Sequence, residues 1–526
     1  MRPQAIPIDQ AFEQSEEQFE AIKLRLCSKE VLGLNHSEVE RDLHQEGMEL
    51  LRRMMQDHLS LRAVQEQQRG LDRPVVGADQ VERTNHRAGD VGLMTSFGPV
   101  RVERISYGKP GVLSLKPLEA QLNVPQDGYS HEVRRRVALE VVRGSYDDAV
   151  EAIDQSTGAH LPKRQAQEVA QRAAQDFDAF YQRGAVPEPQ MGTEGDLVVL
   201  SADGKGVVMR AEALLPATRR AAEQKRHKMH SRLSKGEKKD RKRMATVVAV
   251  YTVERHPRTP EDIMAELAPM HLVGEEQHRP RPQDKRLWAS VVKKPEMVMR
   301  EAFEEGLRRD PDRQQTWVAL SDGNKPQLES FKKLAKEYGI KLTVILDIIH
   351  VVQYLWKATT VFNLESTPQA EQWVEHRLVE ILRGRASQVA AGIRRSATKR
   401  GFKPEQRKAA DKCAGYLLKY AKYMRYGDYL DQGFPIATGV IEGGCRYLIK
   451  DRMDITGARW GMQGAEAVLR LRALKSSGDF DSYWAFHEAC EHERNHSEHY
   501  AGRDVPQVRL SSSMPRSNRS HLQLVD

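Results

Sequence analysis

The chain has 526 residues, of which 39% are hydrophobic and 30% charged, and this polar composition excludes a membrane protein. Its longest uncharged apolar stretch, residues 244–253, is far too short to cross a bilayer. Four scattered cysteines without a Cys-x-x-Cys pair exclude a disulfide scaffold and a cysteine-rich zinc ribbon. The N-terminal residues contain no apolar signal region, so we expect a cytoplasmic protein without a membrane partner.

The net charge of +8 is unevenly distributed. Residues 210–243 carry 13 Lys/Arg against 4 Asp/Glu, which leaves the rest of the chain close to neutral. A basic block on an otherwise balanced protein favours nucleic acid as a partner over the alternative, a solvated surface loop. The residues of this block that we expect to bind DNA are Lys238, Lys239, Arg241, Lys242 and Arg243.

The first 190 residues predict a DNA-binding region. Residues 1–75 are expected to be helical, and residues 76–190 to contain a β-hairpin around Gly98-Pro99 in the run LMTSFGPVRVERISY. A helix that begins at Ser145 in capping-box style, a turn, and a second helix from Pro162 give the layout of a helix-turn-helix. A helical hairpin used only for packing is the alternative. The side chains expected nearest the bases are Lys163, Arg164, Gln165 and Gln167.

Residues 191–350 change to an α/β pattern. Buried strands are predicted in DLVVLSADGKGVVMR (two parts around a polar break), MATVVAVYTVE, QTWVALSDG and KLTVILD. Helices are expected at 295–309 and 326–337, and the proline-rich, charged residues 255–290 predict a loop. A helical insertion is expected at 351–435, the last part of the core at 436–480, and a polar C-terminal tail at 481–526.

Three carboxylates stand out by their positions in this pattern. Asp203 and Asp322 are expected where the first and fourth strands stop, and Glu442 at the head of a helix. Residues just outside strand ends line the functional crevice of an α/β sheet, and three converging carboxylates suit Mg²⁺ or Mn²⁺. Two such ions activate a nucleophile and stabilise the leaving oxygen in phosphoryl transfer. Ordinary turn chemistry of Asp-Gly is the alternative.

The most distinctive motifs are LSADGKGVVM, ALSDGNK, VILDIIHVVQYLWKA and ATGVIEGGCRYLIKDRMDITGARWGMQGAEAVLRLRAL. With them, the chain resembles the DDE transposases of the ISKra insertion-sequence group, related to Mutator-like transposases, over about residues 90–475. The resemblance implies an α/β catalytic core of ribonuclease-H-like type with a helical insertion, preceded by a mainly α-helical DNA-binding region. It also implies that the first and fourth strands are parallel neighbours and that Asp203, Asp322 and Glu442 hold two Mg²⁺ or Mn²⁺ ions.

A second motif decides between Asp322 and Asp347, which also ends a strand. Mutator-like transposases place the second catalytic Asp in an Asp-Gly step and follow it with C/D-x-x-H. Asp347-Ile-Ile-His350 matches that second motif, so the resemblance assigns catalysis to Asp322 and leaves Asp347 and His350 to position DNA or orient a ligand. A buried structural histidine is the alternative for His350. Arg446 and Lys450, spaced to share a helical face with Glu442, are expected near phosphate, with a simple Arg446–Glu442 pair as the alternative.

The sequence therefore predicts a DNA transposase of an insertion sequence, acting in the bacterial nucleoid. Its expected partners are the terminal inverted repeats of its own element and target DNA, bound by a homodimer or higher oligomer. A structure-selective nuclease on the same fold and a domesticated DNA-binding protein without catalysis are the alternatives.

Overall fold

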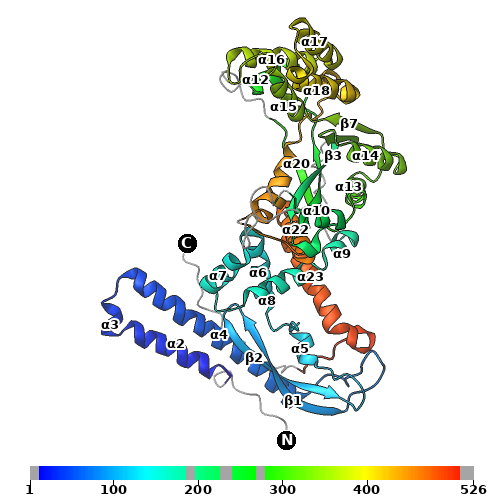
Figure 1. The fold of residues 1–526 in the computed structure, drawn as a ribbon. Helices are drawn as coiled ribbons and strands as arrows, with labels where there is room; N and C mark the ends of the chain where they lie inside the picture. The colour runs from blue at the N-terminus through cyan, green and yellow to red at the C-terminus, as the bar shows by residue number, and fades with distance from the viewer. Residues whose placement is uncertain are drawn as a thin grey trace. The chain divides into compact units, whose positions relative to one another are not determined.

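The computed structural model describes residues 11–184, 196–224, 238, 240–267, 279–455 and 457–509. The chain forms two compact units (Figure 1). The N-terminal unit comprises Met1–Ala185 and Asp481–Asp526, and the sheet unit comprises Val186–Phe480. None of the described helices is both long and apolar enough to span a membrane.

A long helix and a β-hairpin dominate the first part of the N-terminal unit. Helix α4 (His36–Arg69) begins with a capping box between Asn35 and Glu38. It packs on β2 (Gly98–Gly108), which pairs antiparallel with β1 (Asn85–Thr95). The helical region and the hairpin predicted from the sequence are therefore present. Two shorter helices precede α4: α2 (Glu13–Leu26) and α3 (Lys29–Leu32).

Three helices form the region in which a helix-turn-helix was expected. Helices α7 (Tyr146–Ser156) and α8 (Lys163–Ala173) both pack against α6 (His131–Arg143) and bury their apolar faces. The capping box at Ser145 is present, with Asp148 as its acidic member. Two short helices flank the three: α5 (Pro117–Gln121) and α9 (Phe177–Gln182).

The segment after residue 480 differs from the polar tail expected from its composition. It forms α23 (Phe480–Asn495) and belongs to the N-terminal unit up to residue 509. There Glu491 accepts a buried ion pair from Arg134 at 2.7 Å, and His487 bonds to Asp176 at 2.7 Å. The partners Arg134 and Asp176 lie more than 300 positions away in the sequence, so the local composition does not reveal these two contacts. Residues 510–526 lie outside the described ones.

The sheet unit is built on a five-stranded mixed sheet with the order β5-β4-β3-β6-β7. β4 runs antiparallel to both β3 and β5, whereas β6 is parallel to β3 and β7 is parallel to β6. The first and fourth strands are therefore parallel neighbours, as the resemblance implies. The strands are β3 (Leu197–Val208), β4 (Lys242–Val253), β5 (Gln283–Ser290), β6 (Thr316–Ser321) and β7 (Leu342–Leu346).

Two strands differ from the sequence expectation. β3 has no break: its polar residues Asp203 to Gly206 stay paired with β4, so Asp203 lies inside the strand and does not end it. The longer partner β4 holds them in register after the pairing with β6 has stopped at Ser201. β5 lies in the segment expected to be a loop, because only its second half is buried and its first half reads as a polar turn.

Helices connect the strands of the sheet and pack against it. Helices α13 (Pro295–Arg309) and α14 (Lys325–Glu337) lie where the sequence predicts them, and α15 (Ile348–Thr359) follows β7 directly. Two short helices lie between the first three strands: α10 (Pro216–Glu223) and α12 (Pro260–Leu267).

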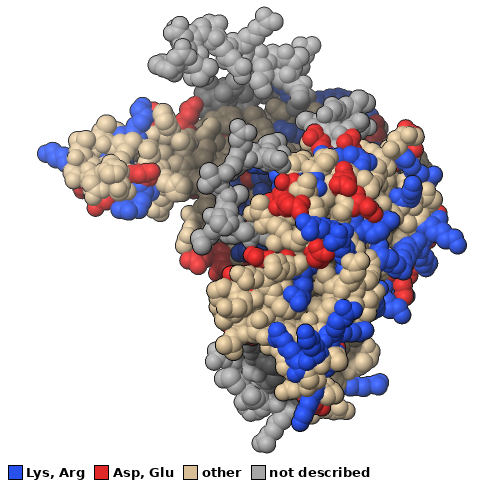
Figure 2. Space-filling view, turned by 90° about the horizontal axis from the view of Figure 1, so that it is seen from above, with Lys and Arg blue, Asp and Glu red and all other residues tan. Residues whose placement is uncertain are grey.

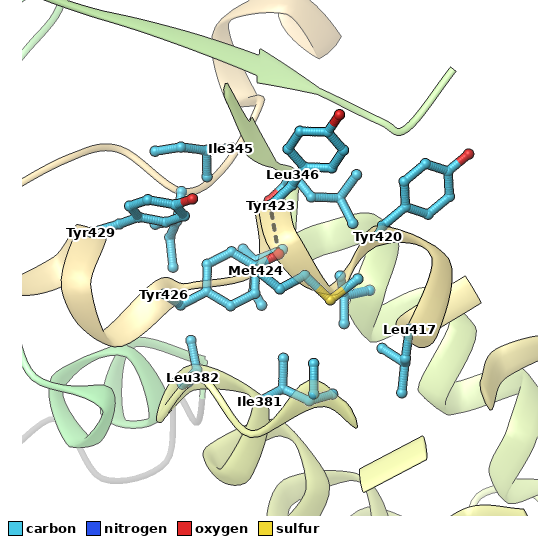
Figure 3. Packing of buried hydrophobic residues seen from close by; sticks show 14 of the residues in the cluster. Ile345, Leu346, Ile381, Leu382, Leu417, Tyr420, Tyr423, Met424, Tyr426 and Tyr429 are labelled. Carbon is cyan, nitrogen blue, oxygen red and sulfur yellow. Dashed lines mark hydrogen bonds between the residues drawn. The ribbon is translucent and has the colours of Figure 1, made fainter. Parts of the chain in front are cut away.

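The expected helical insertion is present and shares its hydrophobic core with the sheet. Leu346 at the end of β7 is buried with Leu382, Leu417 and Tyr426, and the Tyr426 hydroxyl donates to the Leu346 carbonyl at 2.8 Å (Figure 3). This contact fixes the insertion to the strand end at which Asp347 lies. The insertion helices are α16 (Pro368–Leu382), α17 (Ala386–Lys399), α18 (Pro404–Tyr420) and α19 (Tyr426–Asp431).

The chain then returns to the sheet with the helix that carries Glu442. A Cβ atom at Gly444 would lie 2.9 Å from a terminal methyl group of Leu287 on β5, so any larger residue would require the Leu287 side chain to shift. Farther along, the buried carboxylate of Glu466 accepts from Ser290 and from the Val291 amide. The elements are α20 (Gly439–Gly444), a π-helix (Cys445–Lys450), α21 (Asp451–Met453) and α22 (Met462–Ser477).

Candidate active site

Three aspartates lie in or directly after neighbouring parallel strands. The register pairs Ser201 of β3 with Leu320 of β6, and Ser321 of β6 with Leu346 of β7. Asp203 lies two residues after the last β3–β6 pair, and Asp322 and Asp347 directly follow β6 and β7. Because these three strands are parallel, the three aspartates lie at the same end of the sheet.

Asp203 is half-buried and bonded to the segment that carries Glu442. Its Oδ2 accepts from the Cys445 thiol at 3.1 Å, and its Oδ1 accepts from the Gly204 amide at 2.6 Å. Burial, and then the negative charge of Asp203, raise the pKa of Cys445, so the thiol stays protonated and donates. This bond joins β3 to the π-helix three residues after Glu442.

Asp322 follows the end of β6 and starts a tight turn into α14. Its Oδ1 accepts from the Asn324 amide at 2.8 Å, and Gly323 adopts a φ of +90° that favours glycine. The hydroxyls of Tyr416 and Tyr420, both on α18, donate to the carbonyl oxygens of Asp322 and Gly323 at 3.2 and 2.6 Å. The turn is therefore held from the insertion side, and the Asp322 carboxylate remains half-exposed.

Asp347 is fully buried and its carboxylate accepts four hydrogen bonds. Two come from backbone amides at the start of α15, one from His350 Nδ1 at 2.6 Å, and one from the Thr438 amide at 3.0 Å. Thr438 precedes α20, so Asp347 fixes both His350 and the helix that presents Glu442. A carboxylate so fully used orients its neighbours.

His350 and Glu442 complete the site. Because Asp347 accepts the proton on Nδ1, the second ring nitrogen of His350 is left available. The hydrogen bond to Asp347 raises the pKa of His350, and the charges of Asp347, Asp322 and Glu442 add to the effect against the opposing effect of burial. Glu442 is exposed, and among the described residues no hydrogen bond or ion pair involves its carboxylate.

Ligand atoms of Asp347, His350 and Glu442 all lie within 4.8 Å of one another. In the part of the chain that the structure describes, this is the one place where three His, Cys, Asp or Glu residues converge so closely. Asp322 borders the cluster, since its charge acts on His350, and Asp203 borders it through Cys445. The predicted Asp203, Asp322 and Glu442 thus surround one region, whose tightest convergence includes the two residues expected to be accessory.

The donor set fits a hard divalent cation. Asp203, Asp322 and Glu442 offer carboxylate oxygens that face the same region and lack a cationic side-chain partner among the described residues. A His350 nitrogen beside them is also acceptable to Mn²⁺. Four acidic groups around one region repel one another unless a cation compensates them.

Arg446 and Lys450 follow Glu442 in the segment Cys445–Lys450, which is π-helical. That they face phosphate beside Glu442 stays a prediction. Arg446 lies 3.5 Å from Asp451 and does not pair with Glu442. Both cations are exposed.

The residues expected to bind DNA lie in two places. On α8, Lys163 pairs with Asp147 of α7 at 2.5 Å and Arg164 with Glu168 at 3.1 Å, whereas Gln165 and Gln167 are partly exposed. In the basic block, Arg241 borders a cavity of about 540 Å³ together with Arg210 and Arg459. The block residues Lys242 and Arg243 begin β4, Lys238 is described, and Lys239 lies outside the described residues.

Comparison with known proteins adds no family to this geometry. No protein-family model matches the chain. No curated protein matches it either.

Proposed function

We propose that the chain is a DDE-type DNA transposase of an insertion sequence, with a catalytic core of ribonuclease-H-like type. The observation that carries the proposal is the set of aspartates at one end of three parallel strands, with Asp203 in β3 and Asp322 and Asp347 directly after β6 and β7. Glu442 lies near them, on a helix packed closely against the same sheet. The parallel pairing of the first and fourth strands, β3 and β6, also supports it.

In this proposal Asp203, Asp322 and Glu442 hold two Mg²⁺ or Mn²⁺ ions. Bound there, the ions supply an activated water and stabilise the leaving oxygen of a DNA phosphodiester. Asp203 is held by β3, and Asp322 by the turn that Tyr416 and Tyr420 bond. Glu442 is held by the Thr438–Asp347 hydrogen bond and by the close approach at Gly444. His350, oriented by Asp347, places a ring nitrogen beside the acids, where it orients a ligand or a phosphate oxygen.

The substrates are the ends of the element and target DNA. Cleavage at the terminal inverted repeat frees a 3′-hydroxyl. In the same site this hydroxyl attacks a phosphorus of the target, forms a new phosphodiester bond, and displaces the 3′-oxygen of the cut target strand, which leaves as a 3′-hydroxyl. Because two ends are joined to one target, the active form is a homodimer or higher oligomer on the nucleoid DNA of a bacterial cell. A structure-selective nuclease would use the same acids but would leave its products unjoined.

The test is a set of three variants, Asp203→Asn, Asp322→Asn and Glu442→Gln. Each keeps the shape of the side chain and removes its charge. We expect each to abolish Mg²⁺-dependent strand cleavage of DNA that flanks the gene, while binding to the same DNA in EDTA survives. Cleavage that persists in Asp322→Asn but vanishes in Asp347→Asn would show that Asp347 is the second metal ligand.

A further inference from the structure

The most basic surface of the chain lies in the helical insertion. Residues 383–425 contain 13 Lys/Arg and two Asp/Glu, a larger excess than that of residues 210–243. One of the two acids, Asp411, is already paired with Arg407 at 2.8 Å. Figure 2 shows Lys and Arg gathered on the side of the molecule where Figure 1 places α16 to α18.

Part of this charge forms a single stripe along α18. Lys408, Lys412 and Lys419 are exposed and spaced by four and seven residues, which places them on one helical face. Gly415 occupies the gap in the stripe, and a guanidinium nitrogen of Arg394 from α17 lies 4.0 Å from the position of a Cβ there. Four cations thus follow one another over about 17 Å of helix. We call them the α18 stripe.

The cations of the α18 stripe are not used to hold the fold together. Among the described residues, no acidic side chain pairs with Lys408, Lys412, Lys419 or Arg394. Of these four side chains, only Lys419 lies over an aromatic ring in the part of the chain that the structure describes: its ammonium is 4.7 Å from the centre of the Tyr420 ring. A polyanion that binds here therefore displaces only solvent and counterions.

The α18 stripe adjoins the acidic site. Tyr416 lies four residues after Lys412 and three before Lys419, so it is their neighbour on the helix surface. Its hydroxyl donates to the carbonyl oxygen of Asp322, and Tyr420 donates to that of Gly323. One helix therefore presents a row of positive charge and, beside it, fixes the turn that carries a catalytic carboxylate.

We propose that the α18 stripe binds the phosphate backbone of the duplex DNA that enters the acidic site. The inference rests on the proposed function, and it adds the surface that delivers the substrate. A stripe of about 17 Å matches about five base pairs of B-DNA at 3.4 Å each. Because the contacts are to phosphate, they hold any sequence, whether element end or target.

The test compares two triple variants of the full chain with the same change in charge. The first, Lys408→Gln with Lys412→Gln and Lys419→Gln, neutralises the three lysines of the stripe and leaves Arg394 in place. The control, Lys285→Gln with Arg313→Gln and Lys341→Gln, neutralises exposed cations at or near the starts of β5, β6 and β7, at the sheet edge opposite the acids. Affinity for a random 40-base-pair duplex is measured in EDTA between 50 and 200 mM salt.

Each lost phosphate contact lowers the slope of log affinity against log salt by about 0.9. If all three lysines contact phosphate, the slope of the stripe variant falls by about 2.7. Wild type then loses about 40-fold more affinity than this variant over the fourfold rise in salt. The control keeps the wild-type slope.

Equal changes in the two variants would reduce the effect to net charge and overturn the proposal, as would an unchanged slope in both. A slope that falls for duplex RNA but not for duplex DNA would assign the stripe to a different partner. Because EDTA prevents cleavage, these results are independent of the transposase assignment. Failure of the acid variants to affect cleavage would refute the function and leave the stripe standing.

Discussion

Replacing Asp347 by asparagine tests the part of the site that the sequence assigned least clearly. The carboxylate accepts four N–H donors, two on each oxygen, and an amide offers one oxygen and one NH₂. The least costly arrangement turns the NH₂ toward His350, whose Nδ1 then becomes an acceptor and whose proton moves to the other ring nitrogen. The amide oxygen keeps the bond from Thr438 at 3.0 Å.

The expected magnitudes follow from this exchange. The hydrogen bond that the backbone amide of His350 donates to Asp347 is then lost, because the NH₂ group cannot accept it. This site is fully buried, so the variant should be less stable by about 1–3 kcal/mol. The second ring nitrogen of His350, now protonated, no longer accepts a bond or binds a cation. Loss of such an orienting carboxylate typically costs 10- to 100-fold in metal affinity or activity.

Asp310→Asn provides the matched control. Asp310 is also buried, and its carboxylate accepts from two backbone amides and from Trp317 Nε1, but it precedes β6, at the opposite edge of the sheet from the acids. Chemical denaturation should show similar losses of stability for the two variants. Cleavage and its Mg²⁺ dependence, measured where both are folded, should fall only in Asp347→Asn. Equal cleavage by the two variants would refute the positioning role of Asp347.

The pH dependence has a defined sign. Asp347 raises the pKa of His350 in the folded protein, so this pair stabilises fully below the ordinary pKa of about 6.5 and less as pH rises through the raised value. The stability difference between wild type and Asp347→Asn should therefore narrow above that pH. A difference that widens with pH would contradict the assigned cause.

Other expected outcomes concern helix placement, buried charge and the basic block. Gly444→Ala should lower the free energy of unfolding by about 1–3 kcal/mol and displace Glu442. Adding Leu287→Ala to the same chain should restore cleavage in part, because it removes the atom that lies 2.9 Å from the new Cβ. Cleavage that Gly444→Ala leaves unaffected would contradict the close approach. Burial raises the pKa of Glu66 to about 7, so the stability of the wild type should fall as pH rises from about 4.5 to 7. Thermal denaturation of Glu66→Gln should lack this fall. Identical pH profiles of the two proteins would refute the raised pKa. Glutamine substitutions in the basic block should weaken DNA binding without regard to sequence and flatten its salt dependence, and an unchanged slope would exclude the block from the interface; the residues to replace are Lys238, Lys239, Arg241, Lys242 and Arg243.

Local sequence patterns predicted most elements of the sheet unit, and their failures have physical causes. β4, β6 and β7 could be predicted because each contains a continuous apolar run that is followed by turn residues. β5 was not, since QDKRLWAS is polar in its first half and is recruited only by pairing with β4. The unbroken course of β3 through Asp203 likewise depends on its longer partner.

The site was partly visible in the sequence. Asp203, Asp322, Asp347, His350 and Glu442 were all singled out, but their convergence could not be derived from spacing alone, because it depends on the pairing of the strands and on the packing of α15 and α20. The contributions of Cys445, Tyr416 and Tyr420 carried no local signal, since each contacts residues about 100 or more positions away. The positive charge of residues 383–425 can be counted in the sequence, but we did not predict its role, because acidic residues elsewhere cancel it in the net charge of the chain.

The most direct test of the proposed transposase is a joining reaction. Purified full-length protein is incubated with Mg²⁺, a supercoiled target plasmid and labelled duplex DNA that spans the boundary of the element carrying the gene, and the products are sequenced across each junction. We expect cleavage at one nucleotide, the inverted-repeat end, and attachment of the resulting 3′-hydroxyl to plasmid DNA, with neither product in Asp203→Asn or Glu442→Gln. Cleavage without any joined product, or joined product that persists in either acid variant, would contradict it.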